Sequence, residues 1–402
     1  MFKIFNNSIY YIDNNENFCI DKRNYIYILE YLKSGVNNQY VDYLESVGMK
    51  KKILSEPVKL VYAMKKSLDK KQYAYQKPFS FNMEVTTRCK LRCPQCYCYL
   101  DDGKHMNPNV AKKYIYEASK LGISHVNISG GETLEYPYLL DILLCCKENS
   151  ITSNIAISGW NFNEEILQKL IDSGVGNIFV SLNGSTEEIN SKTRDGYNLA
   201  INALSILNKS GFKNYLVNWV AHDNNIDDFP NLIKLLKKYN VRKICVLSLK
   251  PDSQYKMDTI PSLEKFEKLG NFIKSYKDKD LKILIEACYP GLLFYVNGND
   301  TGEVYCMAGR TNFSISVDGK LTPCRHIEYK ESFESINDYW LNSKFLEKIR
   351  NSCLDIREPC LNCKYNDKCI PCAAINYKME GDFFKGNKYC YITKINKGKN
   401  FI

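Results

Sequence analysis

The sequence predicts an α/β protein built on a parallel sheet, either open or barrel-like, and three observations lead to this expectation. From Phe79 onward, strand-like and helix-like segments alternate, which is typical of parallel sheets. A small unit with a different pattern precedes this region, and after about Thr301 the alternation stops in a cysteine-rich stretch. The strand candidates are FNMEVTT, HVNISGG, SNIAISGW, NIFVSLNG, YLVNWVAHD and KICVLSLKP, with helical stretches such as NPNVAKKYIYEASKLG, NEEILQKLIDSG and FPNLIKLLKKYN between them.

The N-terminal residues predict a small α+β unit of winged-helix-like character. FKIFNNSIYYIDN and NFCIDK are expected to form paired strands, with NNEN as their turn. NYIYILEYLKSG and NNQYVDYLESVGMKK carry apolar residues at helical spacing. VKLVYAMKKSLDKKQYAYQK is expected to bridge to the next unit. The predicted domains are therefore residues 1–75, 76–300 and 301–402.

The composition predicts a cytoplasmic protein with metal or redox chemistry. The chain of 402 residues has no apolar run long enough to span a membrane, and its start lacks the pattern of a secretory signal. In a reducing compartment, 17 cysteines favour metal ligation over disulfides. Four of them stand in apolar contexts that predict simple packing, namely Cys19, Cys145, Cys146 and Cys245.

The formal net charge of +10 does not by itself predict a nucleic-acid partner. Lysine is abundant along the whole chain, and basic runs such as Lys50–Lys52 are short and lack a nucleic-acid motif. We therefore expect a solvated basic face, with neither nucleic acid nor a membrane as a partner. An acidic peptide would still be attracted by this charge.

Cys89, Cys93 and Cys96 form a Cys-x3-Cys-x2-Cys run directly after the first strand candidate of the alternating region. Three thiolates this close can hold three irons of a cubane cluster and leave the fourth iron open, whereas an electron-transfer ferredoxin normally supplies a fourth cysteine. The spacing therefore predicts catalysis. A structural zinc site is the alternative, but it needs four ligands, and Cys98 is very close to Cys96 for a tetrahedral site.

Further polar and glycine-rich turns follow the other strand candidates. Gly130–Glu132, Ser158–Gly159 and Asn183–Gly184 each lie just past a strand end. Because the carboxyl ends of parallel strands meet at one edge, these turns and the cysteine run are expected to form one site.

The segment CKLRCPQC resembles the cluster loop of radical S-adenosylmethionine (radical SAM) enzymes. The resemblance continues through Gly130–Glu132, the SLNG segment, the KTRDG segment, and Asn218 with Asn225, and it covers most of the chain from Phe79 onward. It implies a partial (β/α)6 TIM-like barrel. It also implies S-adenosylmethionine (SAM) and a [4Fe–4S] cluster as cofactors, with a 5′-deoxyadenosyl radical as the product of SAM cleavage. The electron donor would be a flavodoxin or ferredoxin.

The resemblance assigns roles position by position. The cluster ligands would be Cys89, Cys93 and Cys96. Two positions depart from the usual family pattern, because Gln95 precedes the third cysteine and Thr133 follows the Gly-Gly-Glu turn. The residues matching SAM contacts are Gly130, Gly131, Glu132, Ser158, Ser181, Asn183 and Arg194.

The cysteines of the last region resemble the SPASM domain, a seven-cysteine extension that holds two auxiliary [4Fe–4S] clusters in peptide and protein maturases. The interval between the third and fourth clustered cysteines departs from the family, with two residues instead of three. Seven cysteines leave one ligand missing, which Cys288, Cys353 or a substrate thiolate could supply. The resemblance implies an outer set of Cys360, Cys363, Cys369 and Cys390, and an inner set of Cys306, Cys324 and Cys372. Zinc knuckles are the alternative.

Together these features predict a radical SAM maturase that removes hydrogen from a ribosomally synthesised precursor peptide. The product would be a thioether, carbon–carbon or ether cross-link, or an epimerised residue, and residues 1–75 would bind the precursor's leader as an added strand. A formylglycine-forming sulfatase maturase, a non-catalytic iron–sulfur electron carrier and a zinc-dependent nucleic-acid binder are the alternatives. Asp223 and Tyr289 are candidate proton acceptors.

Overall fold

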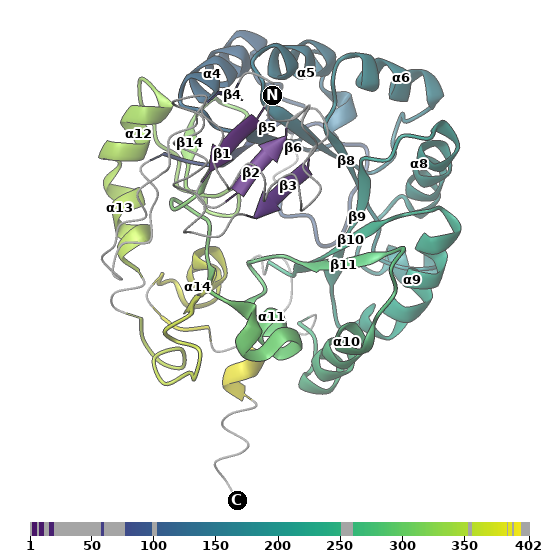
Figure 1. Ribbon diagram of the computed structural model, residues 1–402, viewed down its shortest axis with the longest axis vertical. Coiled ribbons are helices and arrows are strands. Elements are labelled where there is room, and N and C mark those ends of the chain that lie inside the picture. Colours follow the sequence, from purple (N-terminus) through teal and green to yellow (C-terminus); the bar gives the residue numbers. More distant parts are fainter. Residues whose placement is uncertain are drawn as a thin grey trace, which may run out of the picture.

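The structure is a computed structural model. It describes residues 2–5, 8–11, 16–19, 58–59, 77–98, 103–250, 260–352, 356–383, 385–387 and 390–394. Figure 1 shows an arc of strands lined on its outer side by helices, with the C-terminal elements α11 and α14 beside the open part of the arc.

The main sheet has nine strands in the order β11-β10-β9-β8-β7-β6-β5-β13-β14. Neighbouring strands from β5 to β11 are parallel, and this confirms the predicted partial barrel of strands and helices. The strand β11 adds a seventh parallel member that the sequence had not suggested. The bounds are β5 (Ser80–Thr86), β6 (His125–Gly130), β7 (Thr152–Ile157), β8 (Asn177–Ser181), β9 (Tyr215–Ala221), β10 (Lys243–Ser248), β11 (Lys282–Ile285), β13 (Asn312–Ile315) and β14 (Leu321–Thr322).

The outer helices form where apolar residues recur at helical spacing. In α9 the residues Phe229, Leu232, Ile233 and Leu236 are buried on one side, while the lysines face outward. Proline in the first turn suits its start, because that position needs no N–H donor. The helices of the barrel are α4 (Pro108–Lys120), α5 (Leu139–Glu148), α6 (Glu164–Asp172), α7 (Glu187–Ser191), α8 (Tyr197–Ser210), α9 (Phe229–Lys238) and α10 (Leu263–Ser275).

The two faces of the sheet differ in polarity. On β5, Phe81, Met83 and Val85 are fully buried among the residues of the main hydrophobic core. Asn82 and Glu84 alternate with them and therefore project from the opposite face of the sheet. This face is polar, so it can surround a polar ligand.

A ladder of asparagine side chains crosses that polar face. The Nδ2 atom of each donates to the Oδ1 atom of the next, from Asn177 to Asn154 (2.7 Å), to Asn127 (2.9 Å), to Asn82 (3.1 Å) and to Asn312 (2.9 Å). The ladder runs from β8 to β13 and ties the C-terminal region to the barrel.

The C-terminal region joins the barrel through its first strands. β13 pairs parallel with β5, so the sheet continues across the expected boundary at residue 300. A short parallel pair, β12 (Val304–Tyr305) with β15 (Cys369–Ile370), organises the cysteine-rich part. The helices of this region are α11 (Pro290–Asn297), α12 (Ile336–Asn342), α13 (Lys344–Asn351) and α14 (Ala373–Glu380).

The N-terminal unit contains a four-stranded sheet in the order β3-β2-β1-β4. The first expected strand divides into β1 (Phe2–Phe5) and β2 (Ser8–Tyr11), which pair antiparallel, and β3 (Glu16–Cys19) pairs with β2. The first turn was therefore missed, although its Asn-Asn sequence is typical of one. β4 (Val58–Lys59) pairs parallel with β1. The two helices expected between residues 24 and 52 lie outside the described residues.

Within the described ranges, none of the helices combines the length and the apolar character needed to cross a bilayer.

The asparagine ladder generates a stability prediction. Replacing Asn127 by Leu leaves Asn82 Oδ1 and Asn154 Nδ2 without their partner. Each unsatisfied partly buried polar group costs about 1–3 kcal/mol. We expect the free energy of unfolding of the cluster-free protein to fall by that order in a urea titration followed by tryptophan fluorescence. Asn198→Leu on exposed α8 is the matched control, and equal losses for both variants would contradict a role for the ladder.

Candidate functional site

The loop that carries Cys89, Cys93 and Cys96 begins where β5 ends. The backbone N–H of Arg92 donates to Asp195 Oδ2 at 2.7 Å, and the N–H of Gln95 donates to the carbonyl of Thr193 at 3.3 Å. The KTRDG segment therefore holds the cysteine loop in place, which brings together two motifs that are about 100 residues apart in the chain.

Arg194 lies against this loop and leaves a buried donor free. Its Nε atom is buried and has no hydrogen-bond partner. Its positive charge lowers the pKa of Cys93 and Cys96, although burial is the larger effect on Cys93 and leaves that pKa raised. Gln95 contributes a second buried atom without a partner, Oε1. A free buried guanidinium donor beside three thiols is suited to bind the carboxylate of a ligand such as SAM.

The glycines of the Gly130–Glu132 turn are required by contacts within the protein. A Cβ atom on Gly130 would lie 2.2 Å from the carbonyl oxygen of Thr86, and one on Gly131 would lie 2.2 Å from that of Arg88. The N–H groups of Gly131 and Glu132 donate to the same two carbonyls at 2.7 and 2.8 Å. The turn at the end of β6 therefore packs directly on the segment that leads into the cysteine loop.

Glu132 is engaged inside the protein. The residue is 2% exposed, and its carboxylate accepts hydrogen bonds from the backbone N–H of Leu134 (3.3 Å) and of Ser158 (2.9 Å), and from Ser158 Oγ. Burial raises the pKa of Glu132, which these hydrogen bonds oppose. Glu132 and Ser158 thus link the ends of β6 and β7. A contact of Glu132 or Ser158 with SAM stays a prediction.

Asn183 follows β8 and connects the remaining segments of the site. Its Nδ2 donates to Thr193 Oγ1 at 2.8 Å, and its Oδ1 accepts from the N–H of Val220 at 3.1 Å. Asn225 donates to the carbonyl of Asn183 at 3.1 Å. Asn183 therefore positions the segment that carries Arg194. Ser181, the last residue of β8, is half-buried beside it.

A cavity of about 100 Å³ lies between the cysteine loop, the barrel and the C-terminal region. Glu84, Tyr97, Arg325 and His326 line it. The Tyr97 ring packs on His326 with centroids 4.3 Å apart, and the guanidinium of Arg325 lies 5.3 Å from the Tyr97 ring centroid. Burial raises the pKa of Glu84, and Arg325 opposes this effect. Sequence reasoning missed Glu84, Arg325 and His326, although the last two directly follow Cys324.

Four cysteines of the C-terminal half come together in one hydrophobic cluster, and one of them is Cys288. The other three are Cys306, Cys324 and Cys372, and the neighbouring thiols of Cys288 and Cys306, together with burial, raise the pKa of Cys372. Arg310 is fully buried next to them, donates to the carbonyls of Cys306 and Ile349, and helps to lower the pKa of Cys306. We call these four cysteines the inner group. Cys353 lies outside the described residues.

A second group of four forms at the lower end of the C-terminal region. Cys360, Cys363, Cys369 and Cys390 line one small pocket together, and we call them the outer group. Burial raises the pKa of Cys360 and Cys369. The resemblance to SPASM domains implied two sets of cysteines, and the two groups have the same members, with Cys288 added to the inner group.

Among the residues that the structure describes, no group of three or more Cys, His, Asp or Glu side chains is arranged to hold one metal ion.

Three of the cysteines that were expected to pack as small apolar residues lie among the described residues. Cys146 is fully buried, and Cys145 and Cys245 are half-buried.

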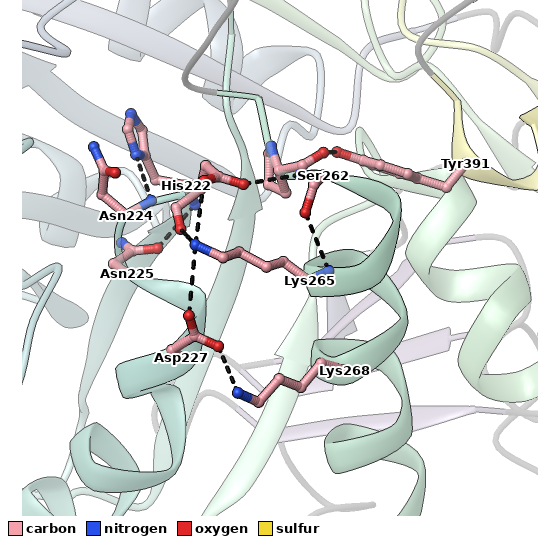
Figure 2. A network of polar contacts seen from close by, with 10 residues as sticks. His222, Asn224, Asn225, Asp227, Ser262, Lys265, Lys268 and Tyr391 are labelled. Carbon is pink, nitrogen blue, oxygen red and sulfur yellow. Dashed lines mark hydrogen bonds and ion pairs between the residues drawn. The ribbon is translucent and has the colours of Figure 1, made fainter.

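Of the two candidate proton acceptors, Asp223 makes polar contacts within the protein, and Tyr289 is buried. Asp223 Oδ1 accepts from the N–H of Ser262, and Asp223 Oδ2 lies 3.2 Å from Lys265 Nζ. Figure 2 shows Lys265 extending from α10 toward the turn after β9, with Asp227 and Lys268 alongside and Tyr391 reaching toward the start of α10. Burial raises the pKa of Tyr289, the other candidate. This network fixes α10 against β9.

Comparison with known proteins agrees with this arrangement. The model of the radical SAM superfamily matches residues 83–236, which contain the cysteine loop, Gly130–Glu132 and Arg194. An AdoMet-dependent heme synthase of Methanosarcina barkeri is 22% identical over 332 residues, which are 76% of this chain and 94% of that protein. A PqqA peptide cyclase of Bradyrhizobium diazoefficiens is 22% identical over 343 residues, which are 80% of this chain and 88% of that protein.

The structural likeness extends over almost the whole chain. The crystal structure of Streptococcus suis SuiB superposes with a TM-score of 0.72 at 17% identity and covers 95% of this chain and 96% of its own. SuiB bound to its precursor peptide SuiA gives 0.70 at 18% identity, with 97% and 98% covered. At these identities the likeness shows a shared fold. Because the family model matches residues 83–236, the chain contains a radical SAM domain, and the chemistry of that superfamily depends on SAM and a [4Fe–4S] cluster.

Proposed function

We propose that this enzyme modifies a ribosomally synthesised precursor peptide by removing a hydrogen atom from one of its carbons. The observation that carries the proposal is the presence of three cysteine sets, namely the loop of three after β5 and the inner and outer groups of four. The likeness to PqqA peptide cyclase and to SuiB with its precursor peptide supports a peptide as substrate. The heme synthase relative shows that similarity at this level does not name the substrate.

In this proposal, Cys89, Cys93 and Cys96 hold the catalytic [4Fe–4S] cluster, and the bound SAM supplies the 5′-deoxyadenosyl radical. Arg194, kept in place by Asn183 and Thr193, binds the SAM carboxylate through its free Nε. Other candidate contacts are Gly130, Gly131, Glu132, Ser158 and Ser181. The inner and outer groups hold the two auxiliary [4Fe–4S] clusters, with Cys288 as the eighth ligand.

The N-terminal unit is proposed to bind the precursor's leader. Among the described residues, β3 and β4 lie at the two ends of the small sheet, so each pairs on one side only. An extended peptide can add to such an edge through main-chain hydrogen bonds.

The proposed electron donor is a flavodoxin or a ferredoxin. The proposed domains are residues 1–75, 76–300 and 301–402.

The proposed activity can be measured directly. The reconstituted enzyme is incubated with SAM, dithionite and the peptide encoded by the neighbouring short reading frame. We expect 5′-deoxyadenosine together with a modified peptide. Loss of two hydrogens indicates a cross-link, and unchanged mass with deuterium uptake from solvent indicates epimerisation. Deletion of residues 1–75 should reduce peptide modification and leave SAM cleavage intact. Absence of 5′-deoxyadenosine from protein with verified clusters would contradict the proposal.

Arg194 provides a test of the SAM site. Arg194→Met removes the free guanidinium, and a hydrogen bond to a charged group contributes about 1.5–3 kcal/mol. We therefore expect SAM to bind about 10- to 150-fold more weakly in equilibrium titrations, with the iron content unchanged. Arg242→Met, at an exposed position before β10, is the control. Wild-type SAM affinity in Arg194→Met would remove Arg194 from the site.

Cys288 provides a test of the auxiliary ligands. Cys288→Ser should lower the iron content and alter the electron paramagnetic resonance (EPR) signal of one auxiliary cluster, because the inner group loses one of its four sulfurs. Cys245→Ser is matched to it, since Cys245 is also half-buried and belongs to neither group. An unchanged signal in Cys288→Ser would mean that another group completes the inner set.

A further inference from the structure

A buried ion pair lies next to the inner group. Lys250 follows β10 and Glu286 follows β11, and pairing of these two strands brings the side chains together. Lys250 Nζ donates to Glu286 Oε1 and, at 3.1 Å, to the carbonyl of Ser248. The N–H of Ser248 donates to the same carboxylate oxygen at 2.6 Å. The side chain of Lys250 is 9% exposed, so the pair places a positive charge inside the protein.

The ion pair lies beside the inner group, because Glu286 comes two residues before Cys288 in the chain. Burial disfavours the charge of Lys250, but Glu286, followed by Cys288 and Cys372, raises the pKa of Lys250 above its usual value. Lys250 also acts on His326, whose pKa is lowered by burial, Arg325, Lys250 and Lys378. The lysine is therefore a buried cation paired with a carboxylate that stands two residues before a cysteine of the inner group.

A fixed charge beside a cluster changes how easily the cluster takes up an electron. Reduction adds one negative charge, and a nearby cation stabilises the reduced form more than the oxidised form. The effect is stronger in a water-poor interior, because charges there are screened less. A nearby carboxylate has the opposite effect. Lys250 and Glu286 are thus expected to change the reduction potential of the inner cluster in opposite directions.

We propose that Lys250 and Glu286 set the reduction potential of the iron–sulfur cluster held by the inner group, with Lys250 raising it and Glu286 lowering it. This inference rests on the proposed auxiliary cluster at Cys288, Cys306, Cys324 and Cys372. Both residues are positioning residues that act through the cluster and do not contact the substrate. A higher potential makes the inner cluster the better electron acceptor.

The experiment is a redox titration of the full-length reconstituted enzyme followed by EPR, without any peptide. The inner cluster is identified as the signal missing from Cys324→Ala. Lys250→Met should shift its midpoint to lower potential, by an amount equal to at least a tenfold change in the ratio of reduced to oxidised cluster, or 59 mV for a one-electron couple. Glu286→Gln should shift the midpoint in the opposite direction, and Lys250→Arg should keep the wild-type value.

The controls separate a charge effect from a structural one. Lys237→Met removes an exposed lysine that is paired with Asp278 on the outer surface, and it should leave all midpoints unchanged. The outer and catalytic clusters are internal references in each variant. The inference is overturned if Lys250→Met and Glu286→Gln shift the midpoint of the inner cluster in the same direction. It is also overturned if neither variant shifts that midpoint. Iron content for only one cluster in the wild type overturns the proposed auxiliary clusters instead.

Discussion

The pairing of β5 with both β6 and β13 is the constraint on which the rest of the structure depends. β5 leads into the cysteine loop, so the position of its last residues fixes the position of the predicted cluster ligands. On one side, the glycines of the Gly130–Glu132 turn pack on the backbone of Thr86 and Arg88. On the other side, β13 brings the C-terminal region alongside, and the asparagine ladder connects both neighbours through Asn82. A shift of β5 would therefore displace the loop, the turn and the inner group together.

Two buried arginine groups lie beside cysteines. Arg194 lies by the cysteine loop and Arg310 lies by Cys306, and the Nε atom of each has no hydrogen-bond partner within the protein. Burying an unpaired charge is costly, so each cation needs an anionic partner. Thiolates bound to a cluster carry negative charge and would satisfy this need. The charge distribution of the interior therefore supports clusters at these sites, independently of the number and spacing of the cysteines.

The sequence predicted the alternating strands and helices well, because each outer helix and each strand carries its own periodic pattern of buried residues. The resemblance to SPASM domains implied two cysteine sets, and the structure places the same residues in two groups, although their role as cluster ligands stays a prediction. The sequence could not predict that β13 joins β5, since that pairing links residues more than 200 positions apart and leaves no local signal. It also missed the Lys250–Glu286 pair, which forms only because β10 and β11 are neighbouring strands. The sequence also could not show that Glu132, a predicted SAM contact, accepts hydrogen bonds from Leu134 and Ser158 within the protein.

The short interval between Cys369 and Cys372 gives the two cysteine groups a common backbone. Cys369 lies in β15 and belongs to the outer group, while Cys372 belongs to the inner group, so only Ile370 and Pro371 separate them. β12 pairs with β15 and continues into Cys306, whose N–H donates to the carbonyl of Ile370. Proline restricts the backbone of this link. The interval that departs from the family pattern is therefore the point where the backbone joins the two cysteine groups most directly, through only two residues.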